Sequence, residues 1–120
     1  MTEKYEQLQN SIADIASELF RFQRVFEKAI KKLSIEEQNK YISQFSWFSK
    51  RVTKAMSEAD LRVLNLEGLP YDPGMAVTPL NIDDFEKDEL LFVEQMMEPI
   101  IMADDAVYKT GTVILGRAER

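Results

Sequence analysis

The chain of 120 residues contains no cysteine and no histidine. The absence of cysteine excludes disulfide bonds, thiolate zinc sites and thiol nucleophiles. The absence of histidine removes the most common metal ligand and the side chain that titrates nearest neutrality, on which most hydrolytic triads depend. The sequence therefore predicts a protein that is not an enzyme, with no catalytic residue, no metal site and no cofactor.

Basic side chains and long apolar runs are also scarce. Lys and Arg number 15 against 21 Asp and Glu, and the resulting net charge of -6 opposes binding to a phosphate backbone. No stretch approaches the roughly 18 apolar residues that span a bilayer, and the first ten residues lack the basic and apolar tracts of a secretory signal. We expect a cytoplasmic protein whose partner is neither a nucleic acid nor a membrane.

Glycine and proline are absent before Gly68. In this part of the chain, apolar residues alternate in spacings of three and four from Tyr5 to Leu33, which is the pattern of a coiled-coil seam. The pattern predicts a helix from Thr2 to Leu33. The seam residues that we expect to mediate dimerisation are Leu8, Ile12, Ile15, Leu19, Phe22 and Phe26.

A second helix is predicted to begin at Ser34, because Ser34 and Glu37 have the spacing of a capping box. The short connection favours an antiparallel hairpin. Two such hairpins can bury their apolar stripes in a four-helix bundle, which predicts a homodimer. The alternative is a monomer in which the C-terminal segment folds back over the hairpin.

All four glycines and all four prolines lie between Gly68 and Gly116, which indicates turns between short strands. The predicted fold class is α+β, with a helical dimerisation hairpin at residues 1–66 and a small β-rich domain at residues 67–120. The candidate strands are Arg62 to Leu66, Ala76 to Thr78, Leu90 to Met97, Pro99 to Met102, and Ala106 to Leu115. The run from Leu90 to Met97 is equally compatible with a helix.

The most specific motif in the chain is Glu67-Gly68-Leu69-Pro70-Tyr71-Asp72-Pro73. Gly68 permits a positive φ, and Asp72 before a proline is suited to closing a turn through its side chain. We interpret the motif as a tight turn with Tyr71 as a buried anchor.

This motif, together with Ala76-Val77, resembles the junction between helices and β domain in the GrpE family, which reads Glu-Gly-x-Pro-aromatic-Asp-Pro and then Ala-Val. The final hairpin of that family, Asp-Arg-Val-Leu-Arg-Pro-Ala-x-Val, is similar to the segment from Asp105 to Val113. Two differences stand out: the loop before Ala76 is about two residues shorter, and Ala106 replaces an arginine that contacts the chaperone in the family.

The resemblance implies a nucleotide exchange factor that binds a DnaK-type ATPase and promotes release of its ADP. It also implies that exposed residues of the β domain hold this partner, and the candidates are Gly74, Met75, Asp105, Tyr108 and Lys109. The alternative function is that of a coiled-coil adaptor or assembly subunit without exchange activity.

An acidic segment contains Asp83, Asp84, Glu86, Asp88 and Glu89. It lacks the spacing and the central glycine of an EF-hand loop, which argues against a calcium site. The remaining interpretations are a solvated loop and a surface complementary to a basic partner.

Overall fold

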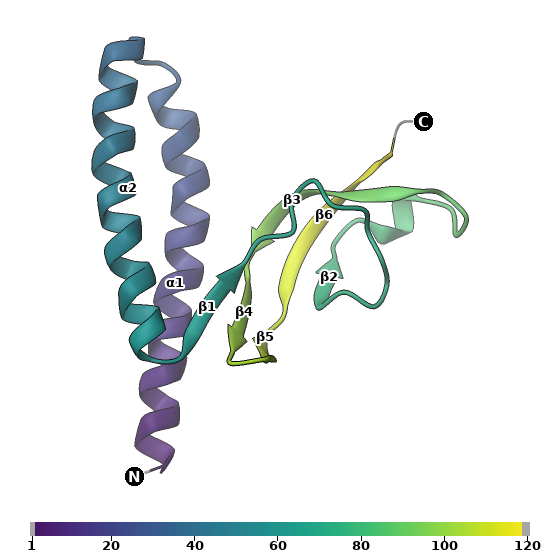
Figure 1. Cartoon of the computed structure of the whole chain (residues 1–120). Coiled ribbons are helices and arrows are strands. Elements are labelled where there is room, and N and C mark those ends of the chain that lie inside the picture. Colours follow the sequence, from purple (N-terminus) through teal and green to yellow (C-terminus); the bar gives the residue numbers. More distant parts are fainter. Residues whose placement is uncertain (1, 119–120) are drawn as a thin grey trace. The chain divides into compact units, whose positions relative to one another are not determined.

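The computed structural model describes residues 2–118 of the chain. The chain consists of two compact units, Met1–Arg62 and Val63–Arg120. The first unit holds two long helices and the second a set of short strands, which confirms the α+β fold class (Figure 1). The boundary lies within strand β1 (Leu61–Leu64), four residues before the position predicted from the sequence, after residue 66.

The helical unit consists of α1 (Thr2–Ile30) and α2 (Ile35–Glu58). The predicted start of the second helix is confirmed, because the Ser34 side chain accepts a hydrogen bond from the Glu37 amide at 3.2 Å. The first helix ends at Ile30 and not at Leu33 as predicted. The Leu33 amide bonds to the Ile30 carbonyl at 2.9 Å, an i to i−3 bond that belongs to a turn and not to an α-helix.

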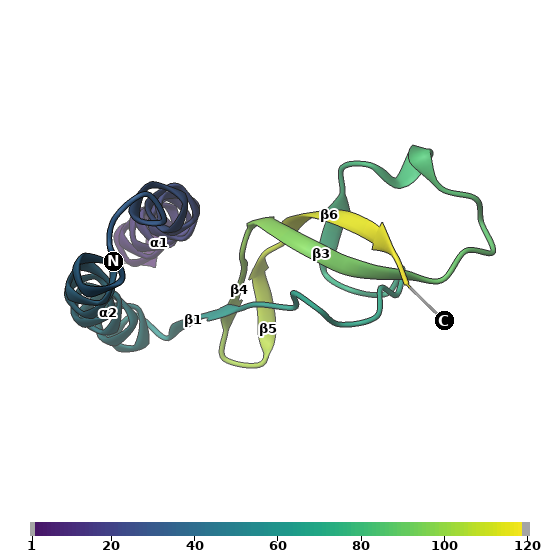
Figure 2. The ribbon, with the colours of Figure 1, turned by 90° about the horizontal axis from the view of Figure 1, so that it is seen from above.

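The two helices lie side by side and antiparallel in both views of the ribbon (Figures 1 and 2). The buried residues of α1 are the small Ala13, Ala16 and Ser17 together with Ile30, and Met56 is buried on α2. Small residues let two helix backbones approach closely. The Gln9 side chain adds a hydrogen bond of 3.0 Å to the Ala59 carbonyl just after α2.

Besides β1, which the unit boundary divides, the β unit contains β2 (Val77–Pro79), β3 (Leu91–Glu98), β4 (Ile100–Ala103), β5 (Ala106–Lys109) and β6 (Gly111–Arg117). One sheet has the order β1-β4-β5 and the other the order β2-β6-β3. The predicted final strand from Ala106 to Leu115 is wrong as a single element. The chain leaves the first sheet at Thr110, and Gly111 begins a strand of the second sheet.

Strand β3 settles the ambiguity of the run from Leu90 to Met97 in favour of a strand. It pairs antiparallel with β6, and β2 pairs with the other edge of β6 in parallel. Alternate residues of β6 are buried, and Val113 and Leu115 meet the fully buried Val93 and Met96 of β3 in the core. This period of two is the pattern of a sheet with one covered face.

Asn81 extends the parallel pairing beyond the end of β2. Its side-chain amide donates a hydrogen bond of 2.9 Å to the Leu115 carbonyl, and its side-chain oxygen accepts one of 2.9 Å from the Leu115 amide. The side chain thus replaces one residue of a neighbouring strand. A short 3₁₀ helix, η1 (Ile82–Asp84), follows directly.

We expect Asn81→Ala to lower the free energy of unfolding of the β unit by about 1–3 kcal/mol, because the Leu115 amide and carbonyl lose their partner. Urea unfolding followed by NMR signals of the β unit measures this change. Asn65→Ala is the matched control, since the exposed Asn65 side chain accepts a local hydrogen bond of 2.9 Å from the Glu67 amide and does not bridge two strands. Equal losses in the two variants would show that the pairing with β6 carries no special stability.

Candidate functional site

The predicted dimerisation seam divides into two rows on α1. Ile12, Leu19 and Phe26 are half-buried, whereas Leu8, Ile15 and Phe22 are exposed. Each row repeats every seven residues, so the exposed row forms a continuous stripe along one side of the helix. The single chain therefore leaves half of the seam uncovered.

Four phenylalanines connect this stripe to α2. Phe22 lies 6.5 Å from Phe26 between ring centroids, Phe26 stacks on Phe45 at 5.0 Å, and Phe45 meets Phe48 edge-on at 6.3 Å. The row crosses from one helix to the other, and the two residues at its ends, Phe22 and Phe48, present aromatic surface to solvent. We call this surface the aromatic face.

In the β unit, the motif Glu67–Pro73 runs along the free edge of β3. The Gly68 amide donates to the Val93 carbonyl at 2.8 Å, and the Tyr71 amide donates to the Leu91 carbonyl at 2.8 Å. The motif therefore pairs with β3 as a short edge segment. Tyr71 is half-buried, so it is less enclosed than the buried anchor that the sequence predicted.

Glu67 fixes the start of this segment. Its carboxylate accepts a hydrogen bond of 3.3 Å from the Met96 amide, at the place where a shift of register between Met96 and Glu98 disturbs the pairing of β3 with β6. The Leu66 amide donates to the Met96 sulfur at 3.1 Å. Gly68 has a φ of 87°, the positive value predicted for it.

The loop after the motif is closed by Asp72, as predicted. Its side chain accepts a hydrogen bond of 3.1 Å from the Gly74 amide, and its carbonyl accepts one of 2.9 Å from the Met75 amide. Gly74 is exposed, but Met75 is half-buried. The prediction that Met75 is an exposed loop residue is therefore wrong.

The remaining predicted contacts lie on the hairpin of β4 and β5. Asp105 is exposed in its two-residue turn, next to Asp104, which adopts a φ of 54°. Tyr108 and Lys109 are half-buried, so the exposure expected of Lys109 is also wrong. Contact of any of these residues with a partner stays a prediction.

The structure brings only some of these candidates together. The Gly111 amide donates to the Ala76 carbonyl at 3.0 Å, which places the Gly74-Met75 loop beside the end of β5 that carries Lys109. Asp105 lies at the opposite end of β5, about 13 Å from Lys109 along an extended strand. A partner that contacts all of the candidates must therefore cover the full length of β5.

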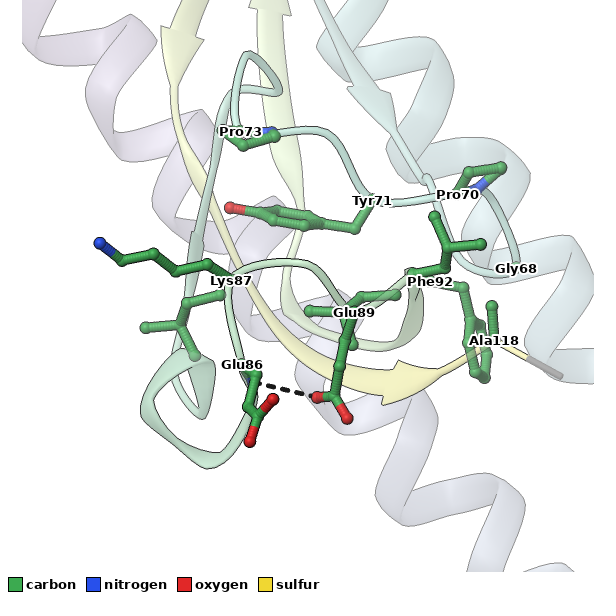
Figure 3. A pocket seen from close by; sticks show the side chains of 12 residues that line it. Gly68, Pro70, Tyr71, Pro73, Glu86, Lys87, Glu89, Phe92 and Ala118 are labelled. Carbon is green, nitrogen blue, oxygen red and sulfur yellow. Dashed lines mark hydrogen bonds between the residues drawn. The ribbon is translucent and has the colours of Figure 1, made fainter.

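A cavity of about 520 Å³ lies beside the motif, and no sequence pattern predicted it (Figure 3). Its walls come from the motif, from the segment before β3, from β3 itself and from the residue that follows β6. The lining residues are Gly68, Pro70, Tyr71, Pro73, Ile82, Glu86, Lys87, Glu89, Leu90, Leu91, Phe92 and Ala118. Apolar side chains predominate among them.

Glu89 and Arg117 hold one side of this cavity in place. The Arg117 Nε donates to a Glu89 carboxylate oxygen at 2.9 Å, and the other oxygen accepts a bond of 3.1 Å from the Glu86 amide. The Arg117 guanidinium also lies 5.0 Å from the centre of the Phe85 ring. The hydrogen bonds from Arg117 and Glu86 keep the pKa of Glu89 below its ordinary value, so this carboxylate stays ionised and paired until the pH falls through the lowered pKa.

Two further classes of site can be assessed directly. Among residues 2–118, no group of three or more acidic side chains is arranged to hold a metal ion. Neither helix of the described chain is long and apolar enough to cross a bilayer.

The geometry therefore offers two candidate surfaces, the aromatic face of the hairpin and the β unit with its cavity. Neither a protein-family model, nor a curated protein, nor a solved structure matches the chain.

Proposed function

We propose that the chain is a cytoplasmic nucleotide exchange factor of the GrpE type, which binds the nucleotide-binding domain of a DnaK-type chaperone and promotes release of its ADP. One observation carries the proposal. The motif that resembles the GrpE junction, Glu67–Pro73, follows the helical hairpin and leads into a small β unit, where hydrogen bonds lay it along β3.

The helical unit supplies dimerisation in this proposal. The aromatic face leaves large apolar side chains in water, and a contiguous patch of this kind is typical of a protein interface. A second copy of the chain presents the same face, so a two-fold contact covers both patches at once.

The β unit supplies the contact with the chaperone. Gly74, Met75 and Lys109 lie near one another and are the preferred contacts, with Asp105 and Tyr108 farther along the hairpin. Ala106 lies on β5 where the family has an arginine, so the partner contact at that position differs from the family's.

Exchange requires that the chain bind the open, nucleotide-free chaperone more tightly than the closed form. The free energy of coupling is reciprocal, so ADP must weaken the complex by the same factor by which the chain weakens ADP binding. The nucleotide belongs to the partner, because the sequence contains no phosphate-binding glycine motif.

We expect a saturating amount of the chain to speed release of fluorescent ADP from its DnaK-type partner, measured by stopped flow. Lys109→Glu is expected to reduce this effect at least fivefold, since it reverses a charge at the proposed contact. Lys31→Glu is the control, because it makes the same charge change in the turn between the helices. A release rate that does not respond to the wild-type chain rejects exchange and leaves the adaptor function.

The adaptor is the second candidate, and Ala106 is the observation that favours it. A chain that binds the chaperone without the family's arginine can tether it to other proteins and leave its nucleotide in place. Binding without accelerated ADP release is the result that distinguishes this function.

A further inference from the structure

The cavity beside the motif has the size and lining of a binding site. Its volume of about 520 Å³ lies within the roughly 300–1,000 Å³ typical of ligand pockets. Tyr71, Leu91 and Phe92 give it apolar walls. Two further lining residues are aliphatic and exposed, Leu90 at 73% and Ile82 at 41%, so apolar surface of the cavity is in contact with water.

A second hollow of about 340 Å³ adjoins the cavity. It shares Glu86, Glu89, Leu90 and Ala118 with the cavity and adds Asp88 and Arg117. The two hollows therefore adjoin along the segment that carries Leu90. An extended chain bound along this segment can contact both hollows.

The charge around the mouth is unbalanced. Of the five carboxylates in residues 83–89, Glu89 is neutralised by its ion pair with Arg117. Four remain, those of Asp83, Asp84, Glu86 and Asp88, against the single positive charge of Lys87. All four are exposed, and none forms an ion pair within the part of the chain that the structure describes.

We propose that this cavity is a docking site for a basic segment of a partner protein, which inserts one apolar side chain between Tyr71 and Leu90. Lysine or arginine residues on either side of that apolar residue lie against Glu86 and Asp88. The apolar walls favour binding of an apolar inserted side chain, and the unpaired carboxylates favour positively charged residues on either side of it. The site is distinct from the predicted contacts on β5 and does not depend on nucleotide exchange.

The probe for this site is the amidated peptide Lys-Lys-Leu-Lys-Lys with an acetylated N-terminus, titrated into the ¹⁵N-labelled full chain. We expect saturable shifts of the Leu90, Leu91 and Ala118 amides in heteronuclear NMR spectra. Replacing the central leucine of the peptide with glycine is expected to weaken binding at least fivefold, because the apolar anchor is lost. A peptide with glutamates in place of the four lysines is expected not to bind.

Two pairs of variants test the two halves of the proposal. Leu90→Gln is expected to weaken binding of the lysine peptide at least fivefold. Leu80→Gln is expected to leave this binding unchanged, because Leu80 is similarly exposed, at 58%, but lies outside the cavity lining. Asp88→Asn is expected to weaken binding of the lysine peptide about threefold at low salt. Asp105→Asn, in the hairpin turn, is expected to leave this binding unchanged.

The proposal fails if the lysine peptide produces no saturable shifts at millimolar concentration. It also fails if the glutamate peptide binds equally well, or if Leu90→Gln binds like the wild-type chain. Because Leu90 and Asp88 are both exposed, spectra of these variants should otherwise match the wild type, which separates loss of binding from loss of folding.

Discussion

Replacing Ile15 and Phe22 with aspartate is expected to convert a dimer of this chain into a folded monomer. Both side chains are exposed in the single chain, at 62% and 55%, so their replacement leaves the packing between α1 and α2 intact. In the dimer, each buried apolar side chain contributes about 1.5–3 kcal/mol, and a symmetric interface contains four of them. A loss of at least ~6 kcal/mol weakens association by about four orders of magnitude.

Sedimentation equilibrium measures the mass, and circular dichroism shows whether the helices persist. Lys28→Asp is the control, since Lys28 is exposed on α1 but lies neither three nor four residues from any position of the seam. Phe26→Asp is expected to lose helical signal as well, because Phe26 stacks on Phe45 within the hairpin. A wild-type chain that sediments as a monomer at several hundred micromolar would falsify the dimer.

Gly111→Ala is expected to lower the free energy of unfolding of the β unit by about 2–3 kcal/mol, typical of an overpacked site. A Cβ at this position would lie 2.8 Å from the Glu98 carbonyl oxygen and 3.1 Å from the Ile100 amide nitrogen. Both are backbone atoms on either side of the buried Pro99, so neither can rotate away. The close contacts of the added Cβ can therefore be removed only if β6 moves away from the connection between β3 and β4.

Gly116→Ala provides the comparison within the same strand. A Cβ there would lie 2.8 Å from a Glu94 carboxylate oxygen and 2.8 Å from the Phe92 ring, but these are side chains that can adopt other rotamers. We expect a loss at least 1 kcal/mol smaller than for Gly111→Ala. Urea unfolding monitored by the methyl signals of Val113 measures both, and equal losses would contradict the argument from backbone contacts.

Local chemistry explains which parts of the fold could be predicted from the sequence. The cap at Ser34, the positive φ of Gly68 and the turn closed by Asp72 each depend on a few consecutive residues. The separation of β5 from β6 at Thr110 does not, because the residues on both sides of it are equally suited to a strand. Only the pairing partners, β4 for one strand and β3 for the other, distinguish them.

The parts of the site that depend on contacts between distant segments could not be predicted from the sequence either. The seam identified Leu8, Ile15 and Phe22 as surface apolar residues, but not which half of the seam the hairpin itself covers. Met75 and Lys109 were expected in exposed positions, and the pairing of Gly111 with the loop half-buries this region. The cavity could not be predicted, because residues 68–73, 82–92 and 118 meet only after the sheet has formed.

The position of β6 in its sheet has a consequence for biosynthesis. It is the last strand among residues 2–118 and the middle strand of its sheet, so β2 and β3 have no strand between them until residue 117 has been translated. The helical hairpin, by contrast, joins neighbouring segments and can form as soon as α2 leaves the ribosome. The hairpin can therefore fold before the β2-β6-β3 sheet is complete. The buried residues of β3 meet their partners on β6 only after that strand has been made.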